Sequence, residues 1–381
     1  MLSVYQMLMI ILMLWFIAYL LAQRAPWLRA RGIEINLLYA LIKTRRLNPW
    51  LDKIASKGTR WWRLFFDLSI ILGFVQLAFG YFWFVNNLMA YFRRPEAAAP
   101  VYPIVPGLTV SLESFVKYML PAIVLVLVTH EFAHGISARI EGIRVRSVGL
   151  ALFFIIPGAF VEPDEDDVEA ATLRSKLRFF SAGSAVNIIL AFLALLLIMA
   201  LFTQTPSGVL VVNTLEGYPA HGVIEPYSVI IEMNGTRISS IKDLSIFMKR
   251  TSPGNIIILK VVDPRGVIKE LPLRLAENPW NKSIGFMGVS ISDYVPSRLP
   301  ISPLASVELM THLLWLHMLS LGVAIVNMMP IYPFDGARFV FALIDKVRGI
   351  GEKTKLGLKA LMMSSALLLL VLNMILTFAR M

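Results

Sequence analysis

The apolar run AIVLVLVT (residues 122–129) passes without a break into the polar motif HEFAH (residues 130–134). On a helix, residues four positions apart lie on the same face, so the imidazoles of His130 and His134 can reach one Zn²⁺ ion. Glu131 lies beside them and could act as general base towards a water molecule that the metal activates. Ionisable groups are costly at membrane depth and usually have a function there. This stretch therefore predicts hydrolysis of peptide bonds within a membrane.

The composition independently indicates a membrane protein. The chain has 57% hydrophobic and 16% charged residues, with a mean hydropathy of +0.69. A helix of about 20 apolar residues crosses a ~30 Å hydrocarbon core. Six segments have a suitable length: 3–22, 64–92, 116–138, 179–202, 305–329 and 359–379. The first has neither a basic leader nor a small-residue cleavage site, so we interpret it as a retained anchor rather than a signal peptide.

The distribution of charge predicts how the chain is oriented. The net charge is +11, and ten basic residues between the first two apolar segments are opposed only by Glu34 and Asp52. These ten are Arg24, Arg29, Arg31, Lys43, Arg45, Arg46, Lys53, Lys57, Arg60 and Arg63. Basic loops next to a membrane span mark the cytoplasmic side and attract anionic lipids. Alternation of the spans then places both termini, and residues 206–296, outside the cytoplasm.

Two classes of function or site are disfavoured. The basic loop carries Trp50, Trp61 and Trp62, which suit anchors at the membrane interface better than platforms for stacking bases. Nucleic acid is therefore not an expected partner. The chain contains no cysteine, which excludes disulfides and thiolate ligands. Any zinc ion must be bound by histidine and carboxylate side chains.

Residues 206–296 differ from the rest of the chain and read as a soluble α+β module. Strands are predicted at 209–212, 229–233, 256–262 and 267–273, and a helix at 241–250. Segments Gly208–Asn213, Tyr218–Ala220 and Val229–Gly235 resemble a PDZ domain of the circularly permuted kind. That resemblance implies a groove for an extended peptide, for a chain terminus or for the substrate. The alternative is a rigid cap outside the cytoplasm.

A third metal ligand is needed, because a catalytic zinc usually has three protein ligands and one open position. The segment NMMPIYPFDG (residues 327–336) ends the fifth apolar stretch. Its two prolines break the helix, and Asp335 follows the break, so this carboxylate could reach the two histidines. Alternatively, Asp335 caps a following helix over residues 337–347, and the histidines only form hydrogen bonds within the bundle.

Together these motifs resemble the site-2 protease family of intramembrane zinc metalloproteases, which combines H-E-x-x-H with a distant N-x-x-P-x-x-x-x-D-G. The matching segments are His130–His134 and Asn327–Gly336. Gly183–Asn187 is similar to the family's G-x-x-x-N, and Gly149–Val161 resembles its membrane re-entrant loop. The resemblance covers residues 116–345.

The resemblance implies a role for individual residues. One catalytic Zn²⁺ ion would be bound by His130, His134 and Asp335. Glu131 would be the catalytic base. Asn187 and Asn327 would hydrogen-bond the substrate backbone or the oxyanion that develops during hydrolysis, or else they hold neighbouring helices together. The implied substrates are transmembrane proteins, which are cleaved within or near their membrane spans.

We therefore expect an all-α polytopic membrane protein with about six transmembrane helices, a membrane re-entrant loop and an inserted extracytoplasmic α+β PDZ-like domain. The expected parts are N-terminal spans with a basic loop (1–115), a first part of the catalytic core (116–205), the PDZ-like domain (206–296), a second part of the core (297–345) and a C-terminal span (346–381). A proton- or ion-coupled transporter and a catalytically silent membrane scaffold remain alternative functions.

The expected location is the plasma membrane, with both termini and the PDZ-like domain outside the cytoplasm. From Lys117 to His130 a helix rises ~20 Å, which places the zinc site roughly 10 Å from the cytoplasmic face of a ~30 Å core. The lipid bilayer itself is thus an expected partner, and water must reach the metal from the cytoplasmic side.

Overall fold

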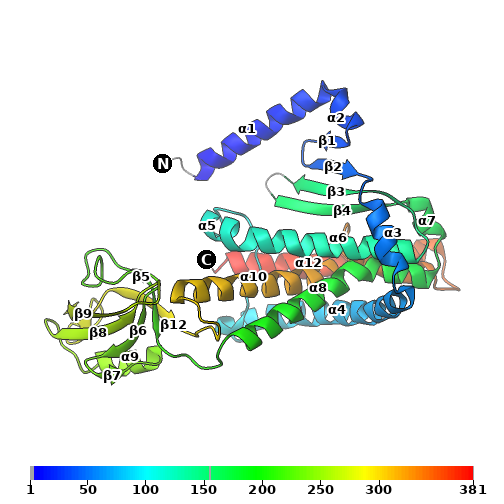
Figure 1. Ribbon diagram of the computed structural model, residues 1–381. Coiled ribbons are helices and arrows are strands. Elements are labelled where there is room, and N and C mark those ends of the chain that lie inside the picture. The colour runs from blue at the N-terminus through cyan, green and yellow to red at the C-terminus, as the bar shows by residue number, and fades with distance from the viewer. Residues whose placement is uncertain (1–3, 154–155, 381) are drawn as a thin grey trace. The chain divides into compact units, whose positions relative to one another are not determined.

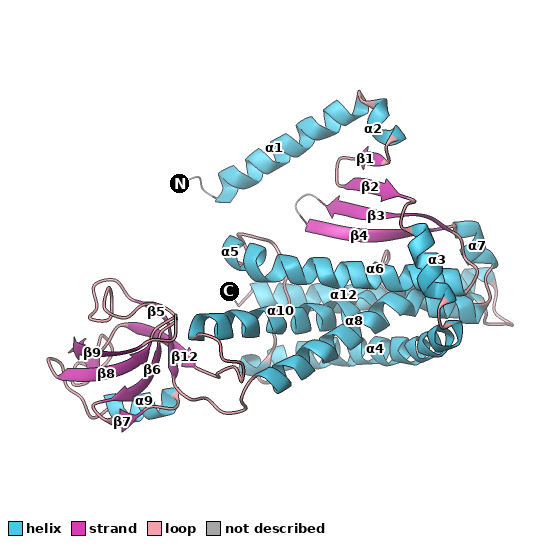
Figure 2. Cartoon of the chain, in the orientation of Figure 1, coloured by secondary structure: helices cyan, strands magenta, loops and turns pink. Residues whose placement is uncertain are grey.

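The computed structural model describes residues 4–153 and 156–380. The chain forms two compact units (Figure 1): Met1–Phe192 together with Trp315–Met381, and Leu193–Leu314. Long helices dominate the first unit, which contains the predicted metal ligands. The second unit contains the strands of the predicted module, which follow one long helix and precede another along the chain (Figure 2).

Five helices among the described residues are long and apolar enough to cross a membrane. They are α4 (Thr59–Arg93), the continuous segment Leu112–Ile140, α8 (Leu173–Leu201), α10 (Pro303–Asn327) and α12 (Glu352–Phe378). All five coincide with predicted spans. The remaining predicted span, residues 3–22, overlaps α1 (Val4–Gln23), of which Leu12–Gln23 is an apolar helix shorter than a span. A sixth span therefore stays a prediction.

The segment Leu112–Ile140 consists of three parts: α5 (Leu112–Ser114), the π-helix η2 (Phe115–Met119) and α6 (Leu120–Ile140). Shorter helices complete the first unit: α2 (Pro26–Ala30), α3 (Asn48–Ser56), η1 (Pro95–Ala97), α7 (Glu165–Ala170) and α11 (Asp335–Asp345).

Buried polar side chains connect α4 to two other long helices. Ser69 shares a hydrogen bond of 2.8 Å with Ser181 on α8. Asn87 donates to Oδ1 of Asn373 on α12 at 2.9 Å. Apolar helices gain little from contacting each other rather than lipid, so bonds of this kind and close packing hold a membrane bundle together.

A buried arginine fixes the end of α6. The Arg178 side chain on α8 is 9% exposed and donates to both carboxylate oxygens of Asp67 on α4. It also donates to Oε1 of Glu141, the residue that follows α6, at 2.7 Å. Removing one partner from a buried ion pair is strongly destabilising. The network therefore locks the position of the helix that carries the HEFAH motif.

A four-stranded antiparallel sheet accompanies the helices of the first unit, so the expectation of an all-α membrane core is incomplete. Its order is β1 (Ile33–Ile35), β2 (Ala40–Thr44), β3 (Val145–Phe153) and β4 (Ile156–Pro163). The predicted re-entrant loop at residues 149–161 is therefore a β-hairpin, apart from residues 154 and 155, which lie outside the described part. Figure 1 shows this hairpin running alongside α6.

Strands β1 and β2 come from the basic N-terminal loop, for which no strand was predicted. Gly149 explains how β2 approaches β3: a Cβ at this position would collide with the carbonyl oxygen of Ile42 and with the Phe160 ring. A glycine is required wherever another backbone comes this close. The N-terminal segment thus covers one edge of the hairpin and leaves β4 as the outer strand.

The second unit contains a twisted sheet with the order β12-β5-β6-β8-β9, and the short strand β7 pairs with β6. The bounds are β5 (Val209–Thr214), β6 (Val229–Met233), β7 (Thr236–Arg237), β8 (Ile256–Val262), β9 (Ile268–Arg274) and β12 (Val289–Asp293). Helix α9 (Ile241–Met248) and the pair β10 (Ala276–Glu277) and β11 (Gly285–Phe286) complete it. The four strands and the helix predicted from the sequence are all confirmed within two residues.

Asp263 organises the turn between β8 and β9. Its Oδ1 accepts hydrogen bonds from the backbone N–H groups of Arg265 and Val267, both at 2.9 Å. Its Oδ2 lies 2.9 Å from Nζ of Lys269. The backbone N–H of Val267 and the charge of Lys269 lower the pKa of the Asp263 carboxyl to about 2. This carboxylate therefore stabilises the folded hairpin in its charged form.

We expect the hairpin to lose stability between pH 3.8, the ordinary pKa of the carboxyl, and about pH 2. A carboxyl whose pKa is depressed on folding contributes stability above its unfolded pKa and loses that contribution as pH falls through its folded pKa. Hydrogen exchange of β8 and β9 amides, compared at each pH with Asp263→Asn, measures the effect. The variant should lack this pH dependence, whereas Glu216→Gln, at an exposed carboxyl of the same module, should retain it.

Candidate metal centre

Three ligand atoms from distant parts of the chain meet in the first unit. Nε2 of His130 and Nε2 of His134 lie 3.1 Å and 3.0 Å from Oδ2 of Asp335, and 3.2 Å from each other. Both histidines are 5% exposed. This is the only group of three or more possible metal ligands found among the described residues. The two histidines and the aspartate predicted from the sequence are thus together.

The spacing of these atoms fits a tetrahedral metal ion. Ligand atoms held ~2.0–2.1 Å from a tetrahedral zinc lie roughly 3.3 Å apart. The three observed separations of 3.0 to 3.2 Å are close to that value. Two imidazoles and one carboxylate also match the three-ligand set of a catalytic zinc, which keeps one position open. The residues present therefore suit a metal ion of this kind.

A break between α10 and the next helix, α11, places Asp335 near the histidines. Helix α10 ends at Asn327, and α11 begins with Asp335 itself. The N-cap of α11 is Phe334, and no side chain caps that helix, so the alternative role of Asp335 as a cap is wrong. Gly336 allows the chain to pass tightly here, because a Cβ would collide with the backbone carbonyl of Met328. The carboxylate is therefore free to point at the histidines.

Backbone and amide groups fix the orientation of both imidazoles. Nδ1 of His134 lies 2.7 Å from the carbonyl oxygen of Phe179, to which it can only donate. A proton on Nδ1 leaves the Nε2 lone pair available for a metal. The carbonyl of Phe179 therefore selects the tautomer of His134 that binds a metal ion.

Asn187 orients the ring of His130 as the carbonyl of Phe179 orients that of His134. Its amide nitrogen lies 3.0 Å from Nδ1 of His130, while its Oδ1 is buried without a hydrogen-bond partner. The two ends of a side-chain amide have nearly the same shape, and their assignment follows from the hydrogen bonds they make. With Oδ1 turned to the ring, the amide accepts from Nδ1–H and leaves Nε2 for the metal. The predicted site residue Asn187 thus contacts His130, a predicted metal ligand.

Gly183 makes room for the same ring. A Cβ at this position would lie 2.5 to 2.6 Å from three ring atoms of His130, including Nε2. Gly183 and Asn187 are one helical turn apart on α8, so one face of that helix both accommodates the imidazole and holds its Nδ1. This geometry gives a physical reason for the G-x-x-x-N spacing.

Glu131 and Asn327 border the ligand group. Oε2 of Glu131 accepts a hydrogen bond from the backbone N–H of Val161 in β4, at 2.8 Å. Nδ2 of Asn327 donates to Oδ2 of Asp335 at 2.6 Å and lies 3.2 Å from Nε2 of His130. All six residues proposed for the site therefore gather around one point of the first unit.

Two groups at this centre had no signal in the sequence. They are the carbonyl of Phe179 and the N–H of Val161, which are backbone groups that any residue could offer. Only the fold decides that these positions face the motif. A hydrogen-bond partner for each histidine could be expected in general, because buried metal-binding histidines use their second nitrogen in this way.

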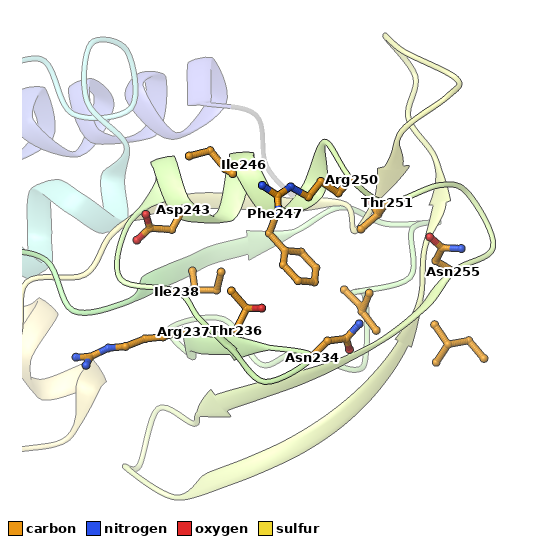
Figure 3. A pocket seen from close by; sticks show the side chains of 12 residues that line it. Asn234, Thr236, Arg237, Ile238, Asp243, Ile246, Phe247, Arg250, Thr251 and Asn255 are labelled. Carbon is orange, nitrogen blue, oxygen red and sulfur yellow. The ribbon is translucent and has the colours of Figure 1, made fainter.

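A cavity of about 570 Å³ lies elsewhere, inside the second unit. Figure 3 shows it between α9, which contributes Ile246 and Phe247, and the residues around β7; Arg250, just after α9, also lines it. Its lining combines apolar side chains with the polar ends of Asn234, Asp243 and Asn255. It contains no cluster of metal ligands among the described residues. The chemistry of the first unit is therefore separate from this cavity.

Comparison with known proteins places the chain among membrane peptidases. Residues 118–372 match the model of peptidase family M50, which is more than half of the chain. An uncharacterized protein of Methanocaldococcus jannaschii is 24% identical over 343 residues, 86% of this chain and 82% of that protein. A membrane-bound transcription factor site-2 protease homolog of Arabidopsis thaliana is 25% identical over 215 residues, which are 54% of this chain and 41% of that protein.

A solved structure is similar to part of the chain. The PDZ domain of an SdrC-like protein from Listeria innocua matches 22% of this chain and 92% of its own length, with 20% identity and a TM-score of 0.21.

We expect Gly183→Ala to weaken metal binding by about 10- to 100-fold, because the added methyl group displaces the His130 ring. Gly322→Ala is the matched control: it also lies within a long helix, but a Cβ there meets nothing within 4 Å. Competition with a zinc chelator, using the purified full chain, measures the affinity. Equal affinities of the two variants would show that His130 does not depend on the space at Gly183.

Proposed function

The chain belongs to peptidase family M50, and from that premise we propose that it is a zinc-dependent endopeptidase that cleaves membrane proteins within or near their transmembrane segments. The observation that carries this proposal is the convergence of His130, His134 and Asp335 beside Glu131. The five helices that can cross a membrane support a substrate that is itself membrane-embedded. The match to family M50 supports the reaction class.

The proposed zinc would be bound by His130, His134 and Asp335. When bound, Zn²⁺ supplies a Lewis acid that lowers the pKa of water towards ~7. Glu131 then accepts the proton of the attacking water on a carboxylate oxygen and returns it to the leaving amine. The hydrogen bond from Val161 holds that carboxylate at the edge of the ligand group.

The two asparagines act through different contacts in this proposal. Asn187 orients His130 by accepting from Nδ1–H, as the distance of 3.0 Å allows. Asn327 donates one N–H of its side-chain amide to Oδ2 of Asp335, at 2.6 Å. The second N–H of the same amide can donate to the substrate backbone or to the developing oxyanion. The alternative, that both only connect helices, is less well supported because each contacts a metal ligand directly.

The outer edge of β4 offers a place for the substrate chain. Strand β4 is last in its sheet, and Val161 donates its N–H to Glu131, away from β3. In an antiparallel pair, alternate residues face the same way, so the N–H and C=O of Ala159 also point outwards. A substrate segment that unwinds from a helix can pair with this edge as an added strand. The carbonyl groups of that substrate segment then lie close to Glu131.

The proposed location is the plasma membrane, with both termini and the module of residues 206–296 outside the cytoplasm. The basic loop before α4 supports this orientation, because such loops stay on the cytoplasmic side. We further propose that the module is PDZ-like and binds the substrate or a chain terminus. A transporter or a silent scaffold accounts less well for an intact Glu131 beside a complete ligand set.

We expect Glu131→Gln to lower cleavage of a model transmembrane substrate by at least about 100-fold, because the general base is lost. Zinc content should remain unchanged, since Glu131 is not a ligand. Cleavage assays with both proteins in lipid nanodiscs, together with metal analysis, measure the two quantities. Unchanged cleavage in the variant would remove the assigned base, and zinc missing from both proteins would favour the transporter or the scaffold.

We expect Ala159→Pro to reduce kcat/KM about fivefold, the effect of losing one backbone hydrogen bond of ~1 kcal/mol. Proline removes the outward N–H and leaves the β3–β4 ladder intact, as Pro157 already does two residues earlier. The matched control is Ala159→Val, which keeps the N–H and suits a strand. Equal rates for the two variants would exclude pairing of the substrate at this edge.

A further inference from the structure

Four exposed aliphatic side chains lie in two segments of the second unit, the start of β9 and residues 299–301. Val267 and Ile268 are 55% and 59% exposed, and Leu299 and Ile301 are 44% and 38% exposed. Single exposed apolar residues are common on proteins, but a contiguous group of them usually marks an interaction site.

Backbone hydrogen bonds bring the two pairs to the helix ends. The N–H of Leu304, in the first turn of α10, donates to the carbonyl of Pro264 in the β8–β9 turn at 3.4 Å. The N–H of Arg298 donates to the carbonyl of Leu201, the last residue of α8, at 2.7 Å. The β8–β9 turn and the segment 298–301 therefore lie against the two helix ends themselves.

The length of α8 places these ends at a membrane boundary. The last basic residue of α8 is Arg178, and the helix continues with uncharged residues to Leu201. This stretch is ~34 Å long at ~1.5 Å per residue, which is close to the ~30 Å thickness of a hydrocarbon core. Leu201 thus lies near the boundary opposite to Arg178, and the residues bonded to it lie at the level of the lipid headgroups.

We propose that Val267, Ile268, Leu299 and Ile301 form a lipid-contact patch that dips into the interfacial layer of the bilayer. The occupant is the boundary between headgroups and acyl chains, where short apolar loops gain by leaving water. Arg265, whose side chain is 75% exposed, and Arg298, whose Nε donates to the carbonyl of Phe202, are close to these residues in sequence and can offer guanidinium N–H groups to lipid phosphates. The patch would hold the second unit against the membrane surface.

Position rather than exposure distinguishes this patch. Ile256 and Ile258, at the other end of β8, are also exposed, at 61% and 51%. They lie in the same hairpin, but six and four residues before the end of β8 at Val262, which is ~20 Å and ~13 Å at ~3.3 Å per residue. If exposure alone drove lipid contact, both ends of the hairpin would behave alike. Only the end of the β8–β9 hairpin that carries the turn should contact lipid.

The absence of cysteine from the chain allows a direct test. Single cysteines replace Val267, Ile268 or Ile301 in the full chain, and each carries an environment-sensitive fluorophore. The proteins are placed in nanodiscs with or without nitroxide-labelled phospholipids. We expect blue-shifted emission that the nitroxide lipids quench at these three positions. Control labels at Ile256→Cys and Ile258→Cys should show neither effect.

Each other outcome overturns the proposal. Unshifted, unquenched labels at the turn end would mean that water covers the patch. Blue-shifted labels that lipid nitroxides do not quench would mean that protein covers it, either a partner or a second copy. Equal quenching at both ends of the hairpin would mean non-specific adsorption. The readout needs neither zinc nor cleavage, so failure of the proposed enzymatic function leaves this test intact.

Discussion

Polar groups that leave water must find partners within the protein, and this requirement organises the whole first unit. At the predicted metal site each histidine has two partners, because one ring nitrogen faces Asp335 and the other faces α8. Elsewhere the same requirement pairs Arg178 with two carboxylates and joins α4 to its neighbours. A site built in this way is rigid, since moving one group would leave another buried and unsatisfied.

The sequence was sufficient to predict that His130, His134 and Asp335 lie together, because their spacing and chemistry are encoded locally. A spacing of four residues puts His130 and His134 on one helical face, and a double-proline break precedes Asp335. The strands of the module were also predictable, since short runs of aliphatic and β-branched residues between turn residues mark them. These features depend on neighbours in sequence rather than on distant contacts.

Other features depend on partners far along the chain and could not be predicted. Strands β1 and β2 have three and five residues within a basic loop, and β2 pairs with a strand about one hundred positions later. The spacing of Gly183 was recognised as a motif, but its reason appears only once the His130 ring is seen against it. The four-stranded sheet that these strands complete is the main feature that the expectation of an all-α membrane core missed.

The distance along the chain between the ligands has a consequence for biosynthesis. His130 and His134 precede Asp335 by 205 and 201 residues, with the entire second unit in between. A ribosome therefore completes the histidine pair long before it adds the carboxylate. A nascent chain that ends before α11 carries the two histidines without Asp335, so the predicted metal site is complete only once α11 has been made.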